Sequence, residues 1–240
     1  MKIIAHRGDS ANHPENTQAS WESAYAAGAD AVEVDIRFSS DGVGVCAHDA
    51  NLQRLFGRSE RPQDLSFAEL QTLRNGEGAR ILPLAEVLQY PSDGRTVLLD
   101  LKDETPRGLE LLWQSIEENV PPAARHLVIA GCHSLEAVRF LAERGGVVIL
   151  GFIQQSDAGL DFVAAGASII RLWECDVVAE RVAPLKDLGV AIWVTAGEGT
   201  TGRLVGDASP EGLLALQAAG VDGVLVNDVT AAFTALRANA

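Results

Sequence analysis

Residues 28–49 read GADAVEVDIRFSSDGVGVCAHD, and this stretch carries the pattern on which the fold prediction rests. Residues 31–37 form a short β-rich run in which successive side chains point to opposite faces, so Glu33 and Asp35 share one face. A loop with Asp41-Gly42 then joins this run to a second extended run, which is typical of a β-hairpin. The stretch therefore predicts a strand with two carboxylates on one face, followed by a hairpin that leads to His48.

Along the rest of the chain, similar short apolar runs alternate with helical patterns. The runs interpreted as barrel strands are residues 2–6, 31–37, 96–102, 126–130, 147–151, 168–172, 190–195 and 223–226. Eight strands with intervening helices in 240 residues predict an α/β fold, the (β/α)₈ or TIM barrel. An open doubly wound sheet is the runner-up, disfavoured because no Gly-rich phosphate loop follows the first strand. We expect one domain over residues 1–240, with residues 41–81 as an inserted hairpin and loop segment after the second strand.

Composition excludes several classes of protein. Hydrophobic residues make up 47% of the chain, which excludes intrinsic disorder, and no apolar run is long enough for an integral membrane segment. The formal net charge of −14 argues against nucleic acid as a partner, because phosphate backbones bind basic surfaces. Three widely spaced cysteines and an N-terminus that leads directly into a strand predict a reduced, cytoplasmic protein. The oligomeric state stays unknown at this stage.

Polar residues gather at the ends of the first three predicted strands, where active sites of such barrels lie. They are His6 and Arg7, Glu33 and Asp35, and Asp100 and Lys102. Three carboxylates that converge repel one another unless a cation lies between them, and hard oxygen ligands suit Mg²⁺ or Ca²⁺. The alternative is that Glu33 and Asp35 only form ion pairs with Arg37, Arg7 or Lys102.

The hairpin brings a second histidine to this centre. If the turn is centred between Asp41 and Gly42, then Asp35 faces His48 across the two antiparallel strands. His6 and His48 would then flank an acidic, metal-competent site, as a general base and a general acid require. Weaker candidates are His13, His126 and His133, Asn16 near the barrel mouth, and Arg171, which either adds positive charge there or pairs with Glu174 or Asp176.

These motifs resemble those of the glycerophosphodiester phosphodiesterases. The resemblance is strongest in AHRGDSANHPENTQAS (residues 5–20) and in residues 28–49, and it continues in LPLAEVL, VLLDLK, AIWVTA and AGVDGVLVND over almost the whole chain. It implies a TIM barrel with a small insertion. It also implies a divalent-metal enzyme that splits a small-molecule phosphodiester into glycerol phosphate and a free alcohol.

The resemblance also implies a role for each matching residue. His6 and His48 would be the acid/base pair, with His6 as the base, and Glu33 and Asp35 would bind the metal. Arg7 and Lys102 would contact the phosphoryl group, and Asp100 would be a third metal ligand in the sequence Asp100-Leu101-Lys102, where the family has Glu-x-Lys. Trp193 would either line the substrate pocket or fill the barrel.

Two other functions stay open. A lysophospholipase D-type reaction on lysolipids would need an apolar rim, for which the candidates are Leu52, Leu55, Phe56, Leu172 and Trp173. A non-catalytic barrel that binds a phosphorylated ligand would be expected to have lost one of His6, His48, Glu33 or Asp35. Because all four are present, the sequence favours the enzyme.

Overall fold

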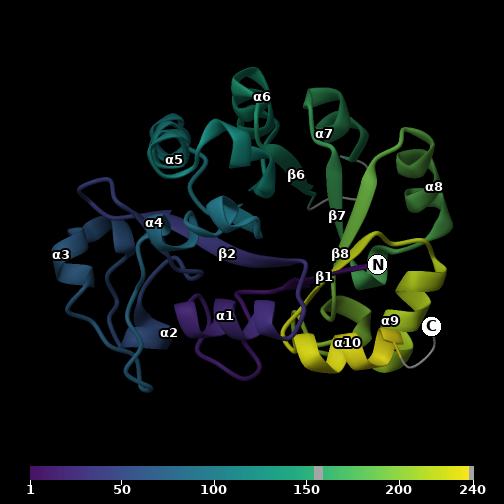
Figure 1. The fold of residues 1–240 in the computed structure, drawn as a ribbon, viewed down its shortest axis with the longest axis horizontal. Helices are drawn as coiled ribbons and strands as arrows, with labels where there is room; N and C mark the ends of the chain where they lie inside the picture. Colours follow the sequence, from purple (N-terminus) through teal and green to yellow (C-terminus); the bar gives the residue numbers. More distant parts are fainter. Residues whose placement is uncertain (154–158, 238–240) are drawn as a thin grey trace.

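The computed structural model describes residues 1–153 and 159–237. Within these residues eight parallel strands close into a barrel, because β1 pairs with β2 on one side and with β9 on the other. Figure 1 shows the strands surrounded by helices, so the predicted (β/α)₈ barrel is confirmed. The barrel strands are β1 (Lys2–Ala5), β2 (Ala31–Phe38), β4 (Thr96–Leu101), β5 (Val128–Cys132), β6 (Val148–Phe152), β7 (Ile169–Trp173), β8 (Ala191–Thr195) and β9 (Gly223–Val226).

Helices connect the strands, and several of them begin at a side chain that satisfies an otherwise free backbone N–H group. Thr17, Thr105, Ser134 and Ser209 each accept a hydrogen bond from the third residue beyond. The connecting helices are α1 (Gln18–Ala26), α5 (Pro106–Asn119), α6 (Leu135–Arg144), α7 (Gly159–Ala165), α8 (Ala179–Asp187), α9 (Pro210–Ala218) and α10 (Val229–Arg237). Short 3₁₀ helices lie at Pro62–Asp64, Tyr90–Asp93, Pro122–Leu127, Glu174–Asp176 and Gly199–Thr201.

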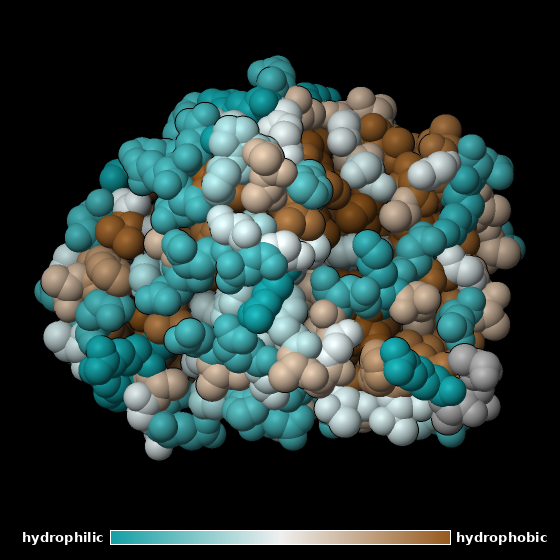
Figure 2. Space-filling model, in the orientation of Figure 1, coloured by the Kyte–Doolittle hydropathy of each residue, from teal (hydrophilic) through white to brown (hydrophobic). Residues whose placement is uncertain are grey.

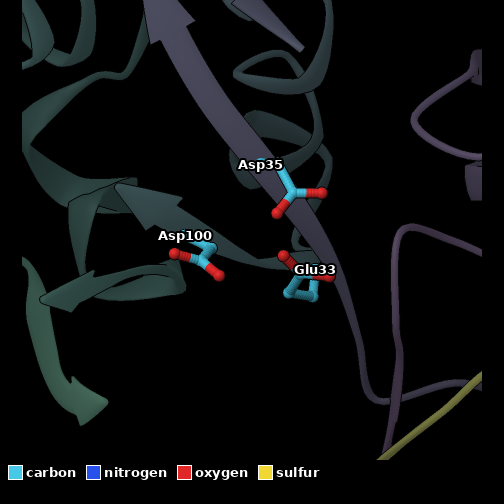
Figure 3. Close-up of side chains that lie close together, drawn as sticks. All are labelled: Glu33, Asp35 and Asp100. Carbon is cyan, nitrogen blue, oxygen red and sulfur yellow. The ribbon is translucent and has the colours of Figure 1, made fainter. Parts of the chain in front are cut away.

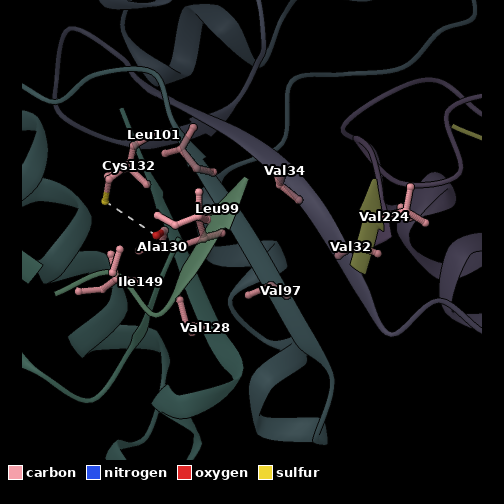
Figure 4. Close-up of a cluster of buried hydrophobic side chains, with 14 of the residues drawn as sticks. Val32, Val34, Val97, Leu99, Leu101, Val128, Ala130, Cys132, Ile149 and Val224 are labelled. Atoms are coloured by element: carbon pink, nitrogen blue, oxygen red, sulfur yellow. Dashed lines mark hydrogen bonds between the residues drawn. The ribbon is translucent and has the colours of Figure 1, made fainter. Parts of the chain in front are cut away.

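The strands alternate between two apolar layers. Side chains such as Val32, Val34 and Leu99 belong to the larger cluster between the sheet and the helices, part of which Figure 4 shows. Their neighbours in sequence point the other way, into the barrel, where a second cluster includes Ile4 and Leu98. Toward the carboxyl ends of β2 and β4 the inward positions include the acidic residues Glu33, Asp35 and Asp100, and these place charge at one mouth of an otherwise apolar barrel.

The segment after β2 extends beyond the ring of strands and helices, at the left of Figure 1. It contains β3 (Gly44–Cys46), which pairs antiparallel with β2, and the short helices α2 (Gln53–Phe56) and α3 (Phe67–Leu70); α4 (Leu84–Val87) follows it. A separate apolar cluster holds this segment together and contains Val45, Leu52, Leu70 and Ile81.

The predicted register of the hairpin is wrong by one residue. Ile36 pairs with Cys46 and Phe38 with Gly44, so Ala47 lies opposite Asp35 and donates its N–H to the Asp35 carbonyl at 3.0 Å. The cause is a three-residue loop rather than a two-residue turn, closed by Ser39 N–H to Val43 O at 2.9 Å, with a positive φ of 84° at Gly42. His48 therefore lies one residue beyond the predicted pair.

The face of the molecule shown in Figure 2 is largely hydrophilic, with hydrophobic residues exposed in the region of α7 and α8. No helix among the described residues has both the length and the apolar character needed to cross a bilayer.

Candidate active site

A pocket of about 250 Å³ opens at the carboxyl ends of the barrel strands. It contains seven of the eight residues for which the sequence predicted a catalytic, metal-binding or substrate-binding role. The described residues that line it are His6, Arg7, Glu33, Asp35, His48, Asp100, Lys102, His133, Phe152, Arg171, Trp173, Thr195, Val205 and Leu225.

Three buried carboxylates form the acidic part of the pocket. Asp35 on β2 lies beside Asp100 on β4 in the register of the parallel pair, and Glu33 lies two residues earlier on the same face of β2. Each offers one oxygen atom, and these oxygens lie within 4.8 Å of one another. Figure 3 shows the three carboxyl groups turned toward a common space. Alternation along two adjacent strands is therefore sufficient to build the cluster that the sequence predicted.

Lys102 lies between two of the carboxylates. Its Nζ atom is 3.1 Å from Asp35 Oδ1 and 2.6 Å from Asp100 Oδ2. Burial alone would raise the pKa of Asp35, but the cations of Lys102 and Arg7 lower it far below its usual value. Burial likewise opposes ionisation of Asp100, whose pKa is kept low by a hydrogen bond from His133 and by Lys102. Both aspartates are thus carboxylates at neutral pH.

Glu33 is in a different electrostatic situation. Burial raises the pKa of Glu33 well above its usual value, and the negative charges of Asp35 and Asp100 raise it further. Its Oε2 atom accepts a hydrogen bond from the Arg7 backbone at 2.8 Å. Its Oε1 atom is buried and has no hydrogen-bond partner among the described residues. Because a buried polar atom is normally paired, this oxygen is the atom of the cluster best suited to bind a cation.

A tight turn after β1 carries Arg7 into the site. Arg7 has a positive φ of 59° and Gly8 one of 81°, and a Cβ atom on Gly8 would lie 2.3 Å from Ser20 Oγ. Glycine is therefore required at this position. The turn directs the Arg7 guanidinium toward Asp35, with Nε 3.4 Å from Oδ2, and toward Glu15 at 3.3 Å.

Asn16 holds Asp35 from a second direction. Its Nδ2 atom donates to Asp35 Oδ2 at 2.9 Å, and its Oδ1 atom accepts from the Asp35 backbone N–H at 3.2 Å. The helix begins only after it, with Thr17 as the N-cap residue. Asn16 therefore lies at the barrel mouth, as the sequence indicated, and is not the N-cap of the helix.

His6 is buried against Asn227, which follows β9. The two side chains meet through His6 Nδ1 and Asn227 Oδ1 at 2.8 Å. The amide orientation of Asn227 is determined by its other end, where Nδ2 donates to the Val205 carbonyl at 2.8 Å and to Asp207 Oδ1 at 3.0 Å. Burial and the Arg7 cation lower the pKa of His6 to about 4. His6 is therefore neutral at physiological pH, with its proton on Nδ1.

His48 is held by a carboxylate and by its own backbone. Its Nδ1 atom lies 2.8 Å from Asp49 Oδ1, and its carbonyl accepts hydrogen bonds from Arg37 at 2.9 and 3.1 Å. Arg37 thus binds the hairpin backbone rather than the acidic cluster. The side chain of His48 is 35% exposed, so this histidine lies at the open side of the pocket and His6 at the closed side.

Asn227, the partner of His6, was not predicted from the sequence, and His133 was only a weak candidate. Asn227 is 221 residues from His6, and no local pattern connects them. His133 lies much closer to the site than a weak candidate should, because its ring bonds Asp100 Oδ1 at 2.7 Å and stacks on Phe152. Its position shortly after the fourth predicted strand was the available signal.

Trp193 takes the second of its two predicted positions. It is 2% exposed, belongs to the apolar cluster inside the barrel, and is not among the described residues that line the pocket. The apolar rim predicted for a lysolipid substrate is not formed by all of its candidate residues. Leu52 and Leu172 are buried, at only 3% and 2% exposure. Trp173 is the one member of that set in the pocket lining as described.

The fold and site define a (β/α)₈ barrel with a charged pocket at the carboxyl ends of its strands, the position of active sites in this class. The chain belongs to the glycerophosphoryl diester phosphodiesterase family, whose family model matches residues 6–145. Among curated relatives, the glycerophosphodiester phosphodiesterase of Caldanaerobacter subterraneus is 34% identical over 130 residues, which are 51% of this chain and 52% of that protein. The protein of the same name from Bacillus altitudinis is 31% identical over 137 residues, 53% of this chain and 54% of that one.

The chain spans about half the length of the curated relatives it matches. A wider match comes from a solved structure, an Oleispira antarctica phosphodiesterase in complex with the product sn-glycerol-3-phosphate. The two structures agree with a TM-score of 0.85 over 99% of this chain and 97% of that one, at 21% sequence identity. At that identity the agreement establishes the fold.

Proposed function

We propose that this protein hydrolyses glycerophosphodiesters to glycerol 3-phosphate and an alcohol, with His6 and His48 as the acid/base pair and a divalent metal ion in the acidic cluster. The observation that carries this proposal is the convergence of His6 and His48, three carboxylates, and the cations of Arg7 and Lys102 in one pocket. A phosphodiester needs each of these groups, because its negative charge repels an incoming oxygen and its alkoxide leaves poorly unless protonated.

Glu33, Asp35 and Asp100 would hold the metal. They fit it because they offer only hard oxygen ligands, as Mg²⁺ and Ca²⁺ prefer, and because Glu33 Oε1 is buried without a partner among the described residues. When bound, a dication at this position would neutralise charge on the phosphoryl oxygens. Its positive charge would also favour the ionised form of Glu33, which the other two carboxylates oppose.

His6 is suited to be the base. Because Asn227 Oδ1 can only accept a hydrogen bond, it keeps the His6 proton on Nδ1 and leaves the lone pair of Nε2 available. Burial and the Arg7 cation keep His6 unprotonated down to about pH 4. Nε2 would take the proton from the 2-hydroxyl of the glycerol as that oxygen attacks phosphorus.

His48 is suited to be the acid. Its Nδ1 partner is the Asp49 carboxylate, which orients the ring and leaves Nε2 as the nitrogen available for proton transfer. Burial would raise the pKa of Asp49, but hydrogen bonds from Arg54 and His48 lower it, so Asp49 stays ionised. Protonated His48 would give its Nε2 proton to the departing alkoxide at the open side of the pocket.

The reaction would then proceed in two displacements. In the first, the bond from the glycerol O2 to phosphorus forms while the bond to the leaving alcohol breaks, which produces a cyclic phosphate. In the second, water activated by His48 attacks phosphorus, and His6 returns the proton to the glycerol O2. Arg7 and Lys102 would contact the phosphoryl oxygens in both steps, since both lie beside Asp35 in the pocket lining.

The test is the release of glycerol phosphate from a panel of glycerophosphodiesters with different headgroups, each with and without EDTA. We expect His6→Ala and His48→Ala each to lower kcat by about 10²–10⁴. EDTA should abolish turnover, and Mg²⁺ or Ca²⁺ should restore it. His126→Ala removes an exposed imidazole in the 3₁₀ helix before β5 and is the control, expected to match wild type.

Two outcomes would contradict the proposal. Faster turnover of a lysophospholipid than of glycerophosphocholine would favour the lysophospholipase D-type reaction. Binding of glycerol phosphate without turnover of any diester would favour the non-catalytic barrel.

A further inference from the structure

The proposed reaction leaves one charged pocket residue without a role. Arg171 lies on β7 between Ile169 and Trp173, on the face of the strand that points into the barrel. In the order of strands around the barrel, β7 is opposite β2, which carries Glu33 and Asp35. Arg171 therefore faces the acidic cluster from the far wall of the pocket.

Arg171 is deeply buried and held between two aromatic rings. The residue is 3% exposed, and its guanidinium carbon lies 4.0 Å from the ring centroid of Trp173 and 5.0 Å from that of Phe152. Phe152 is itself fixed, because its ring occupies the space that a side chain at Gly131 would need. The rings orient the guanidinium without satisfying its N–H donors.

Two donor atoms of Arg171 lack an acceptor in the part of the chain that the structure describes. Nε and Nη1 are buried without a hydrogen-bond partner among these residues. The two carboxylates that the sequence offered as ion-pair partners are both engaged elsewhere, since Glu174 binds Arg203 at 2.5 Å and Asp176 binds Arg181. The other pocket cations have ion-pair partners: Lys102 lies beside Asp35 and Asp100, and Arg7 beside Asp35 and Glu15. Arg7 Nε also makes no hydrogen bond among the described residues, but it lies 3.4 Å from the Asp35 carboxylate.

A buried guanidinium with no ion pair among the described residues is costly, so a role in stability alone does not account for Arg171. Burial lowers the pKa of Arg171 to about 10, against the opposing influence of Asp100 and Asp176, and it remains charged at neutral pH. An apolar side chain would fill the same space without this cost. The charge is therefore better explained by a ligand that supplies the missing acceptors.

We propose that Arg171 binds a second anionic group of the substrate, a carboxylate or phosphoryl group on the far carbon of its glycerol unit. This inference rests on the proposed function, which places the glycerol beside His6 at the closed side and the leaving alcohol beside His48 at the open side. Arg171 belongs to the closed side, because it is buried and lies next to Trp193 in the register of β7 and β8. The preferred substrates are then diesters whose glycerol unit carries an additional negative charge.

Three product-like ligands test this directly. Glycerol 3-phosphate is neutral at its far carbon, 3-phosphoglycerate carries a carboxylate there, and glycerol 1,3-bisphosphate carries a phosphoryl group. Their dissociation constants for wild type, measured by calorimetry in a buffer with Mg²⁺, should show one or both of the latter two binding about tenfold or more tightly than glycerol 3-phosphate. Which of the two binds more tightly identifies the anion.

Variants locate the preference at Arg171. Arg171→Gln should remove the preference while leaving the dissociation constant of glycerol 3-phosphate within a few fold, and Arg171→Lys should retain part of it. Arg95→Gln is the matched control, because Arg95 also lies over two rings, those of Tyr25 and Tyr90, but at the opposite end of the barrel and paired with Glu22. It should leave all three constants unchanged.

The inference fails if wild type binds the three ligands with equal dissociation constants. This outcome is measured on wild type alone and does not depend on whether any variant folds. It also fails if Arg171→Gln weakens all three to the same extent, since Arg171 would then contact the shared phosphoryl group. Glycerophosphocholine turnover by wild type is measured in parallel. Turnover without the preference overturns this inference alone, whereas the preference without turnover of any diester supports the anion site and overturns the proposed reaction.

Discussion

Arg54 and Glu15 form a two-point contact between the inserted segment and the loop after β1, with Arg54 Nη1 and Nη2 2.8 and 2.7 Å from the two carboxylate oxygens. The Nε atom of Arg54 also binds Asp49 at 2.6 Å. Glu15 contacts Arg7, and Asp49 contacts His48. Arg54 therefore binds both of the carboxylates that hold these two proposed functional side chains. It does so from outside the pocket lining.

Arg54→Met should therefore lower kcat/KM for glycerophosphocholine by roughly tenfold or more, because small displacements of reacting groups are costly. Arg54→Lys should recover only part of the loss, since an ammonium group cannot span both carboxylates in the same geometry. Arg58→Met is the control: Arg58 lies in the same segment but pairs with Glu60 at the surface, and such pairs contribute little. Equal losses in the two variants would show that the segment as a whole, rather than Arg54, supports the site.

The acidic limb of the pH profile should report the low pKa of His6. A base must be neutral, and His6 loses its proton above about pH 4, so kcat/KM at saturating metal should fall only as the pH drops toward that value. An exposed histidine would give a limb near pH ~6.5. The measurement is kcat/KM over the range from about one pH unit below the pKa of His6 up to neutral pH.

The Asn227→Asp variant in an Asp207→Asn background moves this limb in a known direction. The carboxylate introduced at position 227 lies beside His6 Nδ1 and favours the imidazolium form of His6. Asp207 now accepts a hydrogen bond from Asn227, so the amide introduced at position 207 would supply a donor to the new carboxylate and avoid placing two carboxylates together. The limb should therefore shift to higher pH. An unchanged limb would mean that a group other than His6 controls it.

How much of the fold and of the site could be predicted from the sequence depends on how far apart in the chain the contacting residues lie. The barrel and the Glu33–Asp35–Asp100 cluster follow from alternation within strands and from the order of neighbouring strands, both of which are local patterns. His48 was placed near the cluster for the same reason, although the three-residue loop moved it by one position. The barrel strand boundaries differ from the predicted ones by at most two residues.

Contacts between distant segments could not be read in this way. The Asn227–His6 bond joins the two ends of the chain and forms only when the barrel closes between β9 and β1. Arg171 was visible as a charge within an apolar strand, but its isolation depends on Arg203 and Arg181 having taken Glu174 and Asp176. Trp193 was ambiguous because pocket and barrel interior share one face of β8, and only its depth separates them.

Metal binding should stabilise the folded protein through Glu33. A ligand that binds only the folded state raises its stability in proportion to the logarithm of the ligand concentration above Kd. We therefore expect Mg²⁺ or Ca²⁺ to raise the Tm of wild type and EDTA to reverse the increase. Glu33→Gln should abolish most of the metal-dependent increase, because the amide removes one anionic ligand.

Glu86→Gln is the control for this measurement. Glu86 is an exposed residue of α4 outside the cluster, so its variant should show the wild-type increase in Tm. A metal-dependent increase that survives in Glu33→Gln would place the binding ion elsewhere on this acidic protein.

Trp193 and Gly223 should be coupled energetically, because the indole occupies the space in front of the glycine. A Cβ atom on Gly223 would lie 2.8 Å from Trp193 Cδ1 and 2.9 Å from Ile4 Cδ1. Gly223→Ala should thus lower the free energy of unfolding by about 1–3 kcal/mol through overpacking. Trp193→Leu should also destabilise, since it leaves a cavity, while changing KM for glycerophosphocholine little.

The double variant separates this packing role from a role in substrate binding. With the indole removed, the alanine methyl group meets one obstacle fewer, so Gly223→Ala should cost less in the Trp193→Leu background than in wild type. The measurement is urea unfolding of the four proteins in the cycle, with KM determined for each. Additive unfolding energies together with a large rise in KM for Trp193→Leu would mean that the indole contacts substrate after all, as one of the two sequence interpretations allowed.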